Sequence, residues 1–314
     1  MTEAVLPVAA TRHRPLAPRR TGDRLWRLLL ALLGLGVVLA LFFVARELWE
    51  LSRPSLRRFG LSFLSSTDWD PTSDAFGALP FAVGTLWTTA IALLLAAPVG
   101  LGGAIFLAEM APPRLRAVLR FPIELLAAIP SVVYGLWGLF VVAPLLRDRV
   151  EPRLGALGLS IFEGPPVGVG ILCAGLVLAV MVLPTLVSLS IDVLVAVPRP
   201  QREGLYALGA TRWEAIRLGV LPTARPGLFG AGMLALGRAL GETMAVTMVI
   251  GNSPELPRSL FATGATLSSV IANELTEAVS PLHQAALAEL GLVLLGGTLA
   301  VSAVGRLLVR RTLA

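Results

Sequence analysis

The sequence contains no lysine, and all 26 basic residues among its 314 are arginine. A phosphate loop of the form G-x-x-x-x-G-K-[ST] needs its lysine to contact the phosphates, and Schiff-base catalysis needs a lysine amine. Both kinds of site are therefore excluded. We expect this chain to bind no cofactor, so a process that uses ATP needs a separate ATPase subunit.

Cysteine and histidine are almost as rare. The one cysteine, Cys173, lies in an apolar run and excludes an internal disulfide, so we interpret it as a small packing residue. The two histidines, His13 and His283, have no neighbours at metal-ligand spacing, and we predict no metal site. No cluster of catalytic groups is visible either, which disfavours a membrane enzyme.

Charge is scarce as well: 15% of the residues are charged, whereas 55% are hydrophobic. A soluble chain of this length rarely has that composition, and an integral membrane protein often does. The net charge is +6, but the arginines gather at the ends of apolar runs, where membrane topology places them. We therefore expect contact with membrane lipid and no nucleic-acid partner.

Six apolar runs are present, and a spanning helix needs roughly 20 mostly apolar residues. The runs cover 25–46, 80–108, 123–146, 167–192, 228–251 and 285–308. The first is long and has no small-residue cleavage site, so we interpret it as a span rather than a signal peptide. The sequence thus predicts an all-α integral membrane fold with six transmembrane helices.

The arginines also predict the orientation of the chain. If the N-terminus is cytoplasmic, 17 arginines lie in inner segments, eight in outer segments and one within a span. This bias places both termini in the cytoplasm. We expect a disordered basic tail over 1–24. The six-span domain then covers 25–314, with the first span and an outer segment at 25–79 and a core at 80–308.

One predicted span carries charge near its middle. The stretch GRALGETMAVTMVIGN, residues 237–252, contains Arg238 and Glu242. A charged side chain at the bilayer centre costs at least about 2.5 kcal/mol, so it is expected to be paired or to face a cavity. On one continuous helix these two residues, four apart, share a face with Gly237 and Gly241 and can form a pair.

Two interpretations remain open for this pair. In the structural one, Arg238 and Glu242 neutralise each other and fix helix packing. In the functional one, the planar guanidinium of Arg238 binds an oxyanion on a translocation path. Glu242 then orients the arginine while the site is empty and keeps it from trapping the anion.

Further polar residues lie within or beside the predicted spans. Ser131 and Tyr134 share a face near the start of the third span, so their hydroxyls either line the path or belong to a kinked packing helix. We interpret Asn252 as a helix C-cap rather than a donor to a ligand. Four acidic residues near span ends are expected to be solvated or to contact lipid headgroups: Glu109, Glu124, Asp192 and Glu289.

The most polar inner segment between spans is the loop 193–227. Residues 207–218 have an amphipathic pattern, and we predict a short helix there that is ended by Pro222 and Pro226. Such a helix either lies on the lipid headgroups or docks onto a soluble partner.

This loop resembles an inner-loop signature of ABC importer permeases, written E-A-A, three residues, G, nine residues, I-x-L-P. Glu203, Gly209, Leu221 and Pro222 stand at its spacing, whereas its two alanines and its isoleucine are replaced. In that family the loop forms a coupling helix that sits in a groove of the ATPase subunit. The resemblance therefore implies that these four residues couple the chain to an ATPase, with Gly209 allowing a sharp turn.

The stretch 237–252 closely resembles the permeases of the high-affinity phosphate importer, the Pst system, and its TMAVTMVIGN end resembles the PstC type rather than its paralogue PstA. FGLSFLSSTDWDP, IELLAAIPSVVYGLWGLFVVAPL and HQAALAELGLVL resemble other segments of the same family. The resemblance covers about 55–314 and implies a type I ABC importer permease fold in a bacterial inner membrane. Permeases for sulfate and molybdate carry a related GRALGE run, so this run alone does not specify the anion.

The resemblance also implies partners and a mechanism. It implies a heterodimer with a PstA-like permease, an ATPase dimer inside that binds ATP and magnesium, and a phosphate-binding protein outside. Arg238 and Glu242 match family residues of functional importance. The chain would then conduct phosphate without chemistry of its own. The alternatives are a permease for sulfate or molybdate, or an autonomous secondary anion transporter, which needs no ATPase-docking loop.

Overall fold

The computed structural model describes residues 20–313, with side chains from 25 to 307. Within that part the chain is helical with no named strand, which confirms the predicted all-α fold. The helices, in chain order, are α1 (Arg20–Phe59), α2 (Ser62–Ser65), α3 (Leu79–Ile105), α4 (Pro113–Ala127), α5 (Ser131–Trp137), α6 (Ala143–Leu145), α7 (Glu151–Gly155), α8 (Ile171–Val195), α9 (Arg199–Ala207), α10 (Arg212–Ala215), α11 (Leu221–Leu240), α12 (Met244–Val249), α13 (Leu267–Glu274) and α14 (Pro281–Leu313). π-helical segments lie at Phe106–Met110, Gly138–Val142, Leu146–Val150 and Ile216–Val220, and a 3-10 turn lies at Ser160–Phe162.

The chain divides into two compact units, 1–47 and 48–314. In the first unit, α1 begins at Arg20, inside the segment 1–24 that the sequence predicts as a tail. The earlier part of that predicted tail lies outside the described residues. The apolar stretch of α1 is exposed throughout, as expected of a helix whose surroundings are lipid. The helix also continues to Phe59, past the predicted end of the first span.

Within residues 20–313, five helical segments are long and apolar enough to cross a membrane. They are Leu25–Phe59, Leu79–Met110, Ser131–Gly155, Ile171–Val195 and Pro281–Leu307. These segments correspond to five of the six predicted spans. The remaining predicted span, 228–251, is helical but broken, and this break shapes the candidate site described below.

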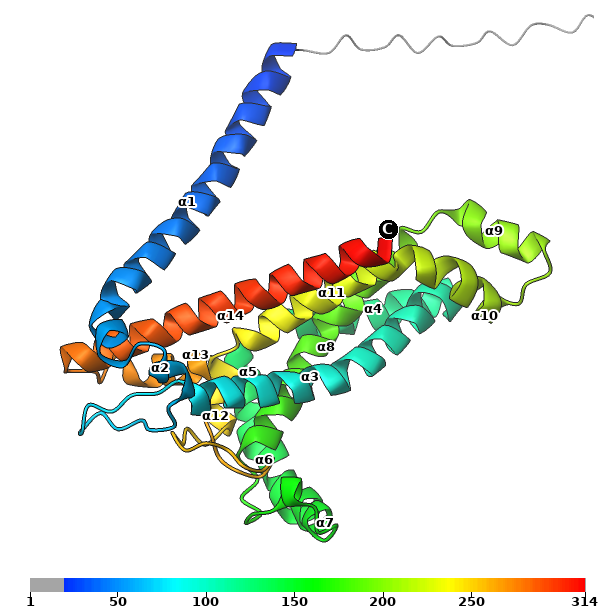
Figure 1. The fold of residues 1–314 in the computed structure, drawn as a ribbon. Coiled ribbons are helices and arrows are strands. Elements are labelled where there is room, and N and C mark those ends of the chain that lie inside the picture. Colours follow the sequence, from blue (N-terminus) through cyan, green and yellow to red (C-terminus); the bar gives the residue numbers. More distant parts are fainter. Residues whose placement is uncertain (1–19, 314) are drawn as a thin grey trace, which may run out of the picture. The chain divides into compact units, whose positions relative to one another are not determined.

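The core of the second unit is built on α3 and α8, which form its most extensive helix pair, with α5, α11 and α12 packed around them (Figure 1). Small residues allow this close approach. A Cβ atom added to Gly175 of α8 would lie 2.6 Å from a methyl carbon of Ile91 on α3. Ala92 and Ala96 of α3 are fully buried in the same core. Because helix association in lipid depends on close backbone packing, these small residues favour a tight α3–α8 contact.

The third span begins later than predicted. The helix α4 ends at Ala127, because Pro130 disfavours a helical conformation in the residue before it, and α5 starts at Ser131. The helical run then continues to Gly155, so it covers Ser131–Gly155 rather than 123–146. π-helical turns flank the short helix α6, which contains Pro144, and keep the run continuous.

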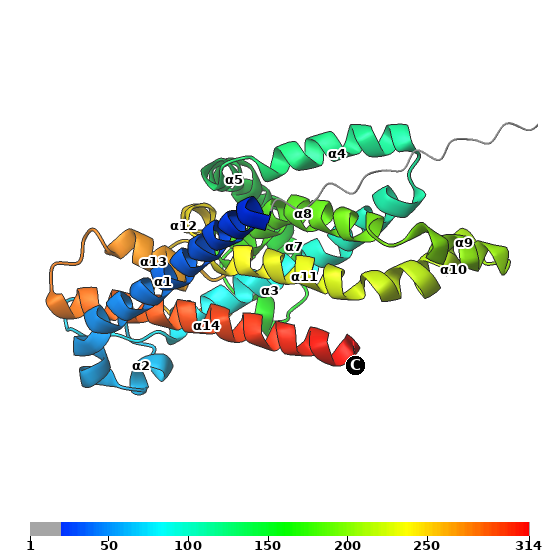
Figure 2. The same cartoon turned by 90° about the horizontal axis from the view of Figure 1, so that it is seen from above.

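The two ends of the second unit carry different helices. Figures 1 and 2 show α9 and α10 at one end, with the C-terminal end of α14 towards them, and α2 and α13 at the other end. The loop 193–227 and the end of the chain therefore lie towards the same end, as predicted for two segments on one side of a membrane. That this side is the cytoplasm stays a prediction.

An aromatic cluster closes the end that carries α2 and α13. Trp69 Nε1 donates a hydrogen bond to Glu274 Oε2 at 2.9 Å, and the same oxygen lies 2.8 Å from Nε2 of His283. Phe76 stacks on the His283 ring at a centroid distance of 5.3 Å. These contacts hold the segment between α2 and α3 against α13 and α14.

Candidate functional site

The fifth predicted span is interrupted next to its charged residues. The helix α11 ends at Leu240, and the chain becomes helical again at Met244, the start of α12. Gly241 caps α11, and the Glu242 carboxylate accepts a hydrogen bond from the backbone N–H of Ala245 at 3.2 Å. Glycine is a poor helix former, and a carboxylate that binds a nearby N–H competes with the helical hydrogen bond. The sequence itself therefore favours a break here.

Hydroxyl groups satisfy the backbone of the interrupted segment. Ser268 Oγ donates to the carbonyl of Glu242 at 2.9 Å, and Thr247 Oγ1 donates to the carbonyl of Thr243 at 2.8 Å. Asn252 adopts φ 50° and donates from Nδ2 to the Thr247 carbonyl at 2.9 Å, so its side chain binds the last turn of α12. The C-cap residue itself is Ile250, so the predicted C-cap position is wrong by two residues. Non-helical backbone at membrane depth is tolerated where protein or a water-filled cavity surrounds it. Side-chain hydrogen bonds therefore stabilise the backbone around the break.

The break corrects the prediction of one continuous helix over 228–251, and with it the predicted Arg238–Glu242 pair. In the part of the chain that the structure describes, no ion pair joins Arg238 to Glu242. Arg238 lies in the last turn of α11 and is exposed, while Glu242 is half-buried and bound to the first turn of α12. The i, i+4 relationship on which pairing depends is lost when the helix ends between the two residues.

The buried face of α11 is a stripe of small residues beside Arg238. It is formed by Ala231, Ala235 and Ala239, four residues apart. Arg238 lies outside this stripe, and a Cβ atom on Gly237 would contact nothing within 4 Å. The small residues that pack are therefore chiefly alanines, together with Gly227, where an added Cβ atom would lie 2.5 Å from a methyl carbon of Val193. At 100° per residue, Arg238 borders the alanine stripe and does not lie opposite to it.

Tyr134 is close to Arg238 but already has a partner. The positive charge of Arg238 acts on the Tyr134 side chain, which is buried at 6% exposure. The Tyr134 hydroxyl donates to the carbonyl of Leu126 at 2.8 Å and so ties α5 to the end of α4. This contact favours the packing interpretation for Tyr134. Ser131 is half-buried at the first position of α5. The assignment of both hydroxyls to a path stays a prediction.

The inner loop forms a helical hairpin. The helix α9 ends at Ala207, and Gly209 follows with φ +82°, a conformation that an L side chain adopts only at a cost, so the predicted sharp turn is present. Thr211 then starts α10 through a capping box with Glu214. The predicted single helix over 207–218 is therefore wrong, because a turn at 208–211 divides it.

The prolines of this loop do not end a helix. Pro222 directly follows a π-helical segment and Pro226 lies inside α11, so the helical run continues through both prolines. The π-helical segment before Pro222 joins α10 to α11. Glu203 of α9 is exposed, whereas Leu221 packs against the inner core cluster. The structure thus places the four predicted coupling residues on the hairpin and at the start of α11, at a separate location from Arg238.

Apolar side chains are exposed on the hairpin. Tyr206 is 44% exposed, Leu208 85%, Trp213 54% and Leu218 64%. A small helical element with this much exposed apolar surface is typical of a contact site for lipid or for another protein. The two interpretations of the loop therefore both remain possible on geometry alone.

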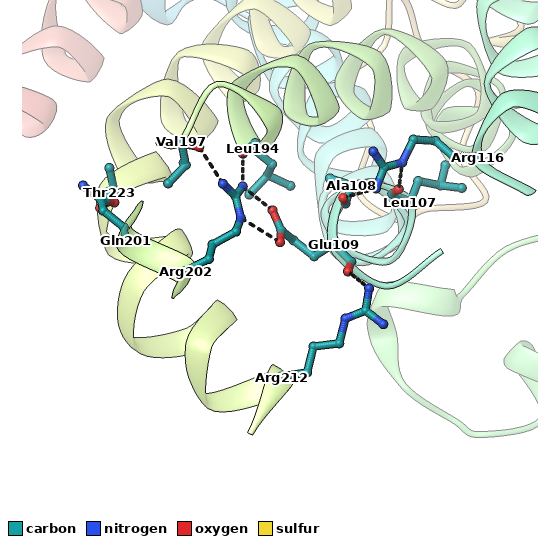
Figure 3. A network of polar contacts seen from close by, with 10 residues as sticks. All are labelled: Leu107, Ala108, Glu109, Arg116, Leu194, Val197, Gln201, Arg202, Arg212 and Thr223. Atoms are coloured by element: carbon teal, nitrogen blue, oxygen red, sulfur yellow. Dashed lines mark hydrogen bonds and ion pairs between the residues drawn. The ribbon is translucent and has the colours of Figure 1, made fainter. Parts of the chain in front are cut away.

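The structure reveals a polar network that the sequence interpretation missed (Figure 3). Glu109, at the end of the helical run of α3, accepts two hydrogen bonds from Arg202 of α9, at 3.1 Å from Nε and 2.6 Å from Nη2. The side chains are 8% and 17% exposed, respectively. The expectation that Glu109 is solvated or touches headgroups is therefore wrong. The only local signal was the position of Arg202, directly before the signature residue Glu203.

The other three acidic residues near span ends differ in exposure. Asp192 and Glu124 are exposed and both contact Arg120, at 3.1 Å and 2.5 Å, in agreement with a solvated position. Glu289 is only 4% exposed, so its predicted solvation is wrong. Its carboxylate lies inside the packed end of α14, which the apolar pattern around it did not indicate.

Comparison with known proteins identifies the family. A family model described as binding-protein-dependent transport system inner membrane component matches residues 100–314. A phosphate transport system permease protein PstC from Mesorhizobium japonicum is 47% identical over 290 residues, covering 90% of this chain and 86% of that protein. Proteins of the same name from Haemophilus influenzae and Xylella fastidiosa are 46% and 43% identical and cover 92% and 99% of this chain, and 93% and 98% of their own lengths.

Solved structures show the same fold. A chain of the inward-facing MetNI methionine ABC transporter matches with a TM-score of 0.54 at 18% identity, over 73% of this chain and 94% of its own. A bacterial ABC transporter that imports the polysaccharide alginate matches with a TM-score of 0.53 at 18% identity, over 90% and 98%. With its apolar helices, the protein is a multi-pass protein of the inner membrane. The chain belongs to the family of binding-protein-dependent transport system inner membrane components.

Proposed function

We propose that this chain is the permease subunit of an ATP-driven importer of inorganic phosphate. It forms the translocation path together with a second, PstA-like permease, and a phosphate-binding protein delivers the anion from outside. Energy comes from an ATPase dimer that docks on the hairpin α9–α10 and holds ATP and magnesium. The names of the relatives, phosphate transport system permease proteins, support phosphate as the substrate.

The observation that carries the proposal is the exposed guanidinium of Arg238 beside the break between α11 and α12. Broken helices of transporters mark substrate sites, because their ends present unpaired polar groups inside the membrane. An arginine provides a planar set of donors that matches an oxyanion such as phosphate. Since Glu242 is bound to Ala245, the Arg238 charge stays available to the anion.

The hairpin supports coupling to a soluble ATPase. Its exposed apolar residues offer a docking surface, and the adjoining helices α8 and α11 lead from it into the core. Movement of the hairpin on ATP binding and hydrolysis would then alternate the access of the site between the two sides of the membrane. The chain itself supplies binding, orientation and movement, and no covalent step.

The test is uptake of radiolabelled phosphate by the complex of both permeases and the ATPase reconstituted in vesicles, with the binding protein on the outside. We expect ATP-dependent uptake that unlabelled phosphate suppresses and that excess sulfate or molybdate leaves intact. Suppression by sulfate or molybdate alone would assign the chain to that anion instead. Phosphate uptake without the ATPase would identify an autonomous secondary transporter and overturn the proposal.

A further inference from the structure

Both helices of the hairpin α9–α10 contact one residue at the end of the helical run of α3, Glu109. Arg202 of α9 binds both oxygens of the Glu109 side chain. Arg212 of α10 donates to the backbone carbonyl of Glu109. The two helices of the hairpin therefore hold the same residue, one through its side chain and one through its main chain (Figure 3).

Arg202 also binds a second span. Its Nη1 donates to the carbonyl of Val197 at 2.5 Å, and its Nη2 donates to the carbonyl of Leu194 at 2.8 Å. The Leu194 carbonyl lies in the last turn of α8 and the Val197 carbonyl two residues beyond it, so Arg202 donates where the helical hydrogen bonding of α8 ends. One guanidinium thus joins α9 to the ends of both α3 and α8, the two helices that form the main packing pair of the core.

The end of α3 is braced from another side as well. Arg116 of α4 donates from Nε to the carbonyl of Leu107 at 2.6 Å and from Nη2 to the carbonyl of Ala108. Glu109 therefore cannot shift alone, because the two residues before it are held by α4. A displacement of Arg202 therefore moves the end of the α3 helical run with it.

The burial of this pair distinguishes it from the other ion pairs on the same side of the protein. Arg120 with Asp192 has side chains that are 41% and 57% exposed, against 17% and 8% for Arg202 with Glu109. Exposed pairs contribute little and change geometry readily. A bidentate pair shielded from water keeps its geometry, since the Arg202 guanidinium is also held by the carbonyls of Leu194 and Val197.

We propose that the Glu109–Arg202 ion pair is the joint that makes the hairpin move together with α3 and α8, and so converts ATPase movement into opening of the path. This inference rests on the proposed docking of an ATPase at α9–α10. Arg202 and Glu109 are positioning residues in this role, because neither touches the anion. Replacement of both members of a buried ion pair by neutral groups is often tolerated for stability, whereas loss of one member leaves the other charge unpaired. The double variant therefore measures the loss of transmitted movement with the smallest cost in stability.

The test uses the complete reconstituted complex and measures phosphate imported per ATP hydrolysed. We expect Glu109→Gln, which keeps the shape of the side chain but removes its charge, to lower this ratio roughly tenfold while the ATPase still co-purifies and hydrolyses ATP. Arg202→Gln should give a similar loss. The double variant should lose no more than the worse single variant, because both substitutions break one joint.

Arg199→Gln is the matched control, since Arg199 is an exposed arginine on the same helix and the charge change is the same. We expect it to leave the ratio unchanged. An unchanged ratio in Glu109→Gln, or losses that multiply in the double variant, would overturn the joint. If Glu109→Gln lowers the amount of folded protein, the test uses Arg202→Lys, which keeps the positive charge but loses the planar bidentate guanidinium. A normal ratio of imported phosphate to hydrolysed ATP in Arg202→Lys contradicts the joint, and a reduced ratio supports it.

A failure of the proposed function gives a different result. If the wild-type complex hydrolyses ATP but imports no phosphate, the substrate assignment fails. The joint is then tested by the stimulation of ATP hydrolysis by the binding protein, which requires a signal across the membrane but no particular anion. Loss of this stimulation in Glu109→Gln but not in Arg199→Gln supports the joint, and its retention in both overturns it.

Discussion

The molecule contains two arginine–glutamate combinations with opposite fates. Arg238 and Glu242 are four residues apart and were expected to pair, yet a helix break separates them and leaves the arginine exposed. Glu109 and Arg202 are 93 residues apart and form a buried bidentate pair. The difference lies in their contacts: the first arginine has no ion pair among residues 25–307, whereas the second joins α9 to the ends of α3 and α8. These contacts fit the two proposed roles, an anion ligand and a joint between helices.

The comparison also explains why an isolated charge is tolerated in a membrane protein. A paired guanidinium in a dry site is fixed by its partners, and an unpaired one persists where water, a ligand or another subunit reaches it. Arg238 is exposed in the single chain, which fits a surface that faces a path or the second permease. The predictions below separate these two uses of arginine, from the largest expected effect to the smallest.

Removal of the free arginine should have the largest effect. We expect Arg238→Ala to lower phosphate uptake by roughly 30-fold or more, equivalent to a loss of about 2 kcal/mol of anion stabilisation. The amount of protein in the membrane should not change, because the Arg238 side chain has no ion pair among residues 25–307, whose side chains the structure describes. Arg225→Ala, at another exposed arginine of α11, is the control and should transport normally. Near-normal uptake by Arg238→Ala would move this residue to a structural role.

The turn of the hairpin should be the next most sensitive point. Gly209→Ala places an L side chain at φ +82°, which costs about 1 kcal/mol, so backbone amides of α9 and α10 should exchange hydrogen roughly fivefold faster. Gly204→Ala is the matched control, because Gly204 lies within α9 and an added Cβ atom meets nothing within 4 Å. That variant should exchange at the wild-type rate or more slowly. Equal exchange in the two variants would contradict the strained turn.

The loss of charge at Glu242 should have a smaller effect than the loss of Arg238. In Glu242→Gln the amide oxygen still accepts the hydrogen bond from Ala245, so we expect uptake within about threefold of wild type. Uptake by this variant and by Arg238→Ala is compared in the same vesicles. If both variants lose uptake equally, the two residues act as a pair, which contradicts a role for Arg238 that is independent of Glu242.

The capping box of α10 should produce the smallest effect. Hydrogen bonds from the Thr211 N–H and hydroxyl hold the pKa of Glu214 below its ordinary value of 4.5. Because the folded-state pKa is lowered, the cap contributes fully above about pH 4.5 and is lost as the pH falls through the lowered pKa. We expect protection of the α10 amides against hydrogen exchange to fall over that acidic window. Thr211→Val loses the hydroxyl but keeps the N–H that binds Glu214, so we expect weaker protection at neutral pH and a smaller fall over the acidic window. An identical pH profile in both proteins would rule out a contribution of the hydroxyl to this cap.

The sequence predicted the helical class and most spans correctly, because long apolar runs and arginine-rich ends are strong local signals. The turn at Gly209 was also predicted, from a residue type whose backbone preference is local. These features depend on the residue itself and its nearest neighbours, so one sequence is enough to predict them.

The missed features depend on distant contacts. The break after Leu240 follows from the helix cap at Gly241 and from the Glu242 carboxylate, which binds the backbone N–H of Ala245. The sequence on both sides of the break is apolar, so the pattern predicts one continuous span. The Glu109–Arg202 pair depends on how α3, α8 and α9 come together, which no spacing in the sequence states. Glu289 is buried for the same reason. Charge near a span end therefore predicts solvation only when no other segment covers it.

The most direct test of the free arginine restores its charge chemically. Cys173 is buried, and replacing it by alanine leaves Arg238→Cys as the one thiol of the chain. Phosphate uptake of the assembled complex is then measured before and after reaction with a small cationic thiol reagent and with a neutral one of the same size. Phe229→Cys, on the opposite side of α11, serves as the control position.

We predict that Arg238→Cys is inactive, that the cationic reagent restores a measurable part of uptake, and that the neutral reagent restores none. The Phe229→Cys protein should transport phosphate with either reagent. No reaction at position 238, or equal recovery with both reagents, would contradict the account in which a free positive charge at the break between α11 and α12 serves the anion.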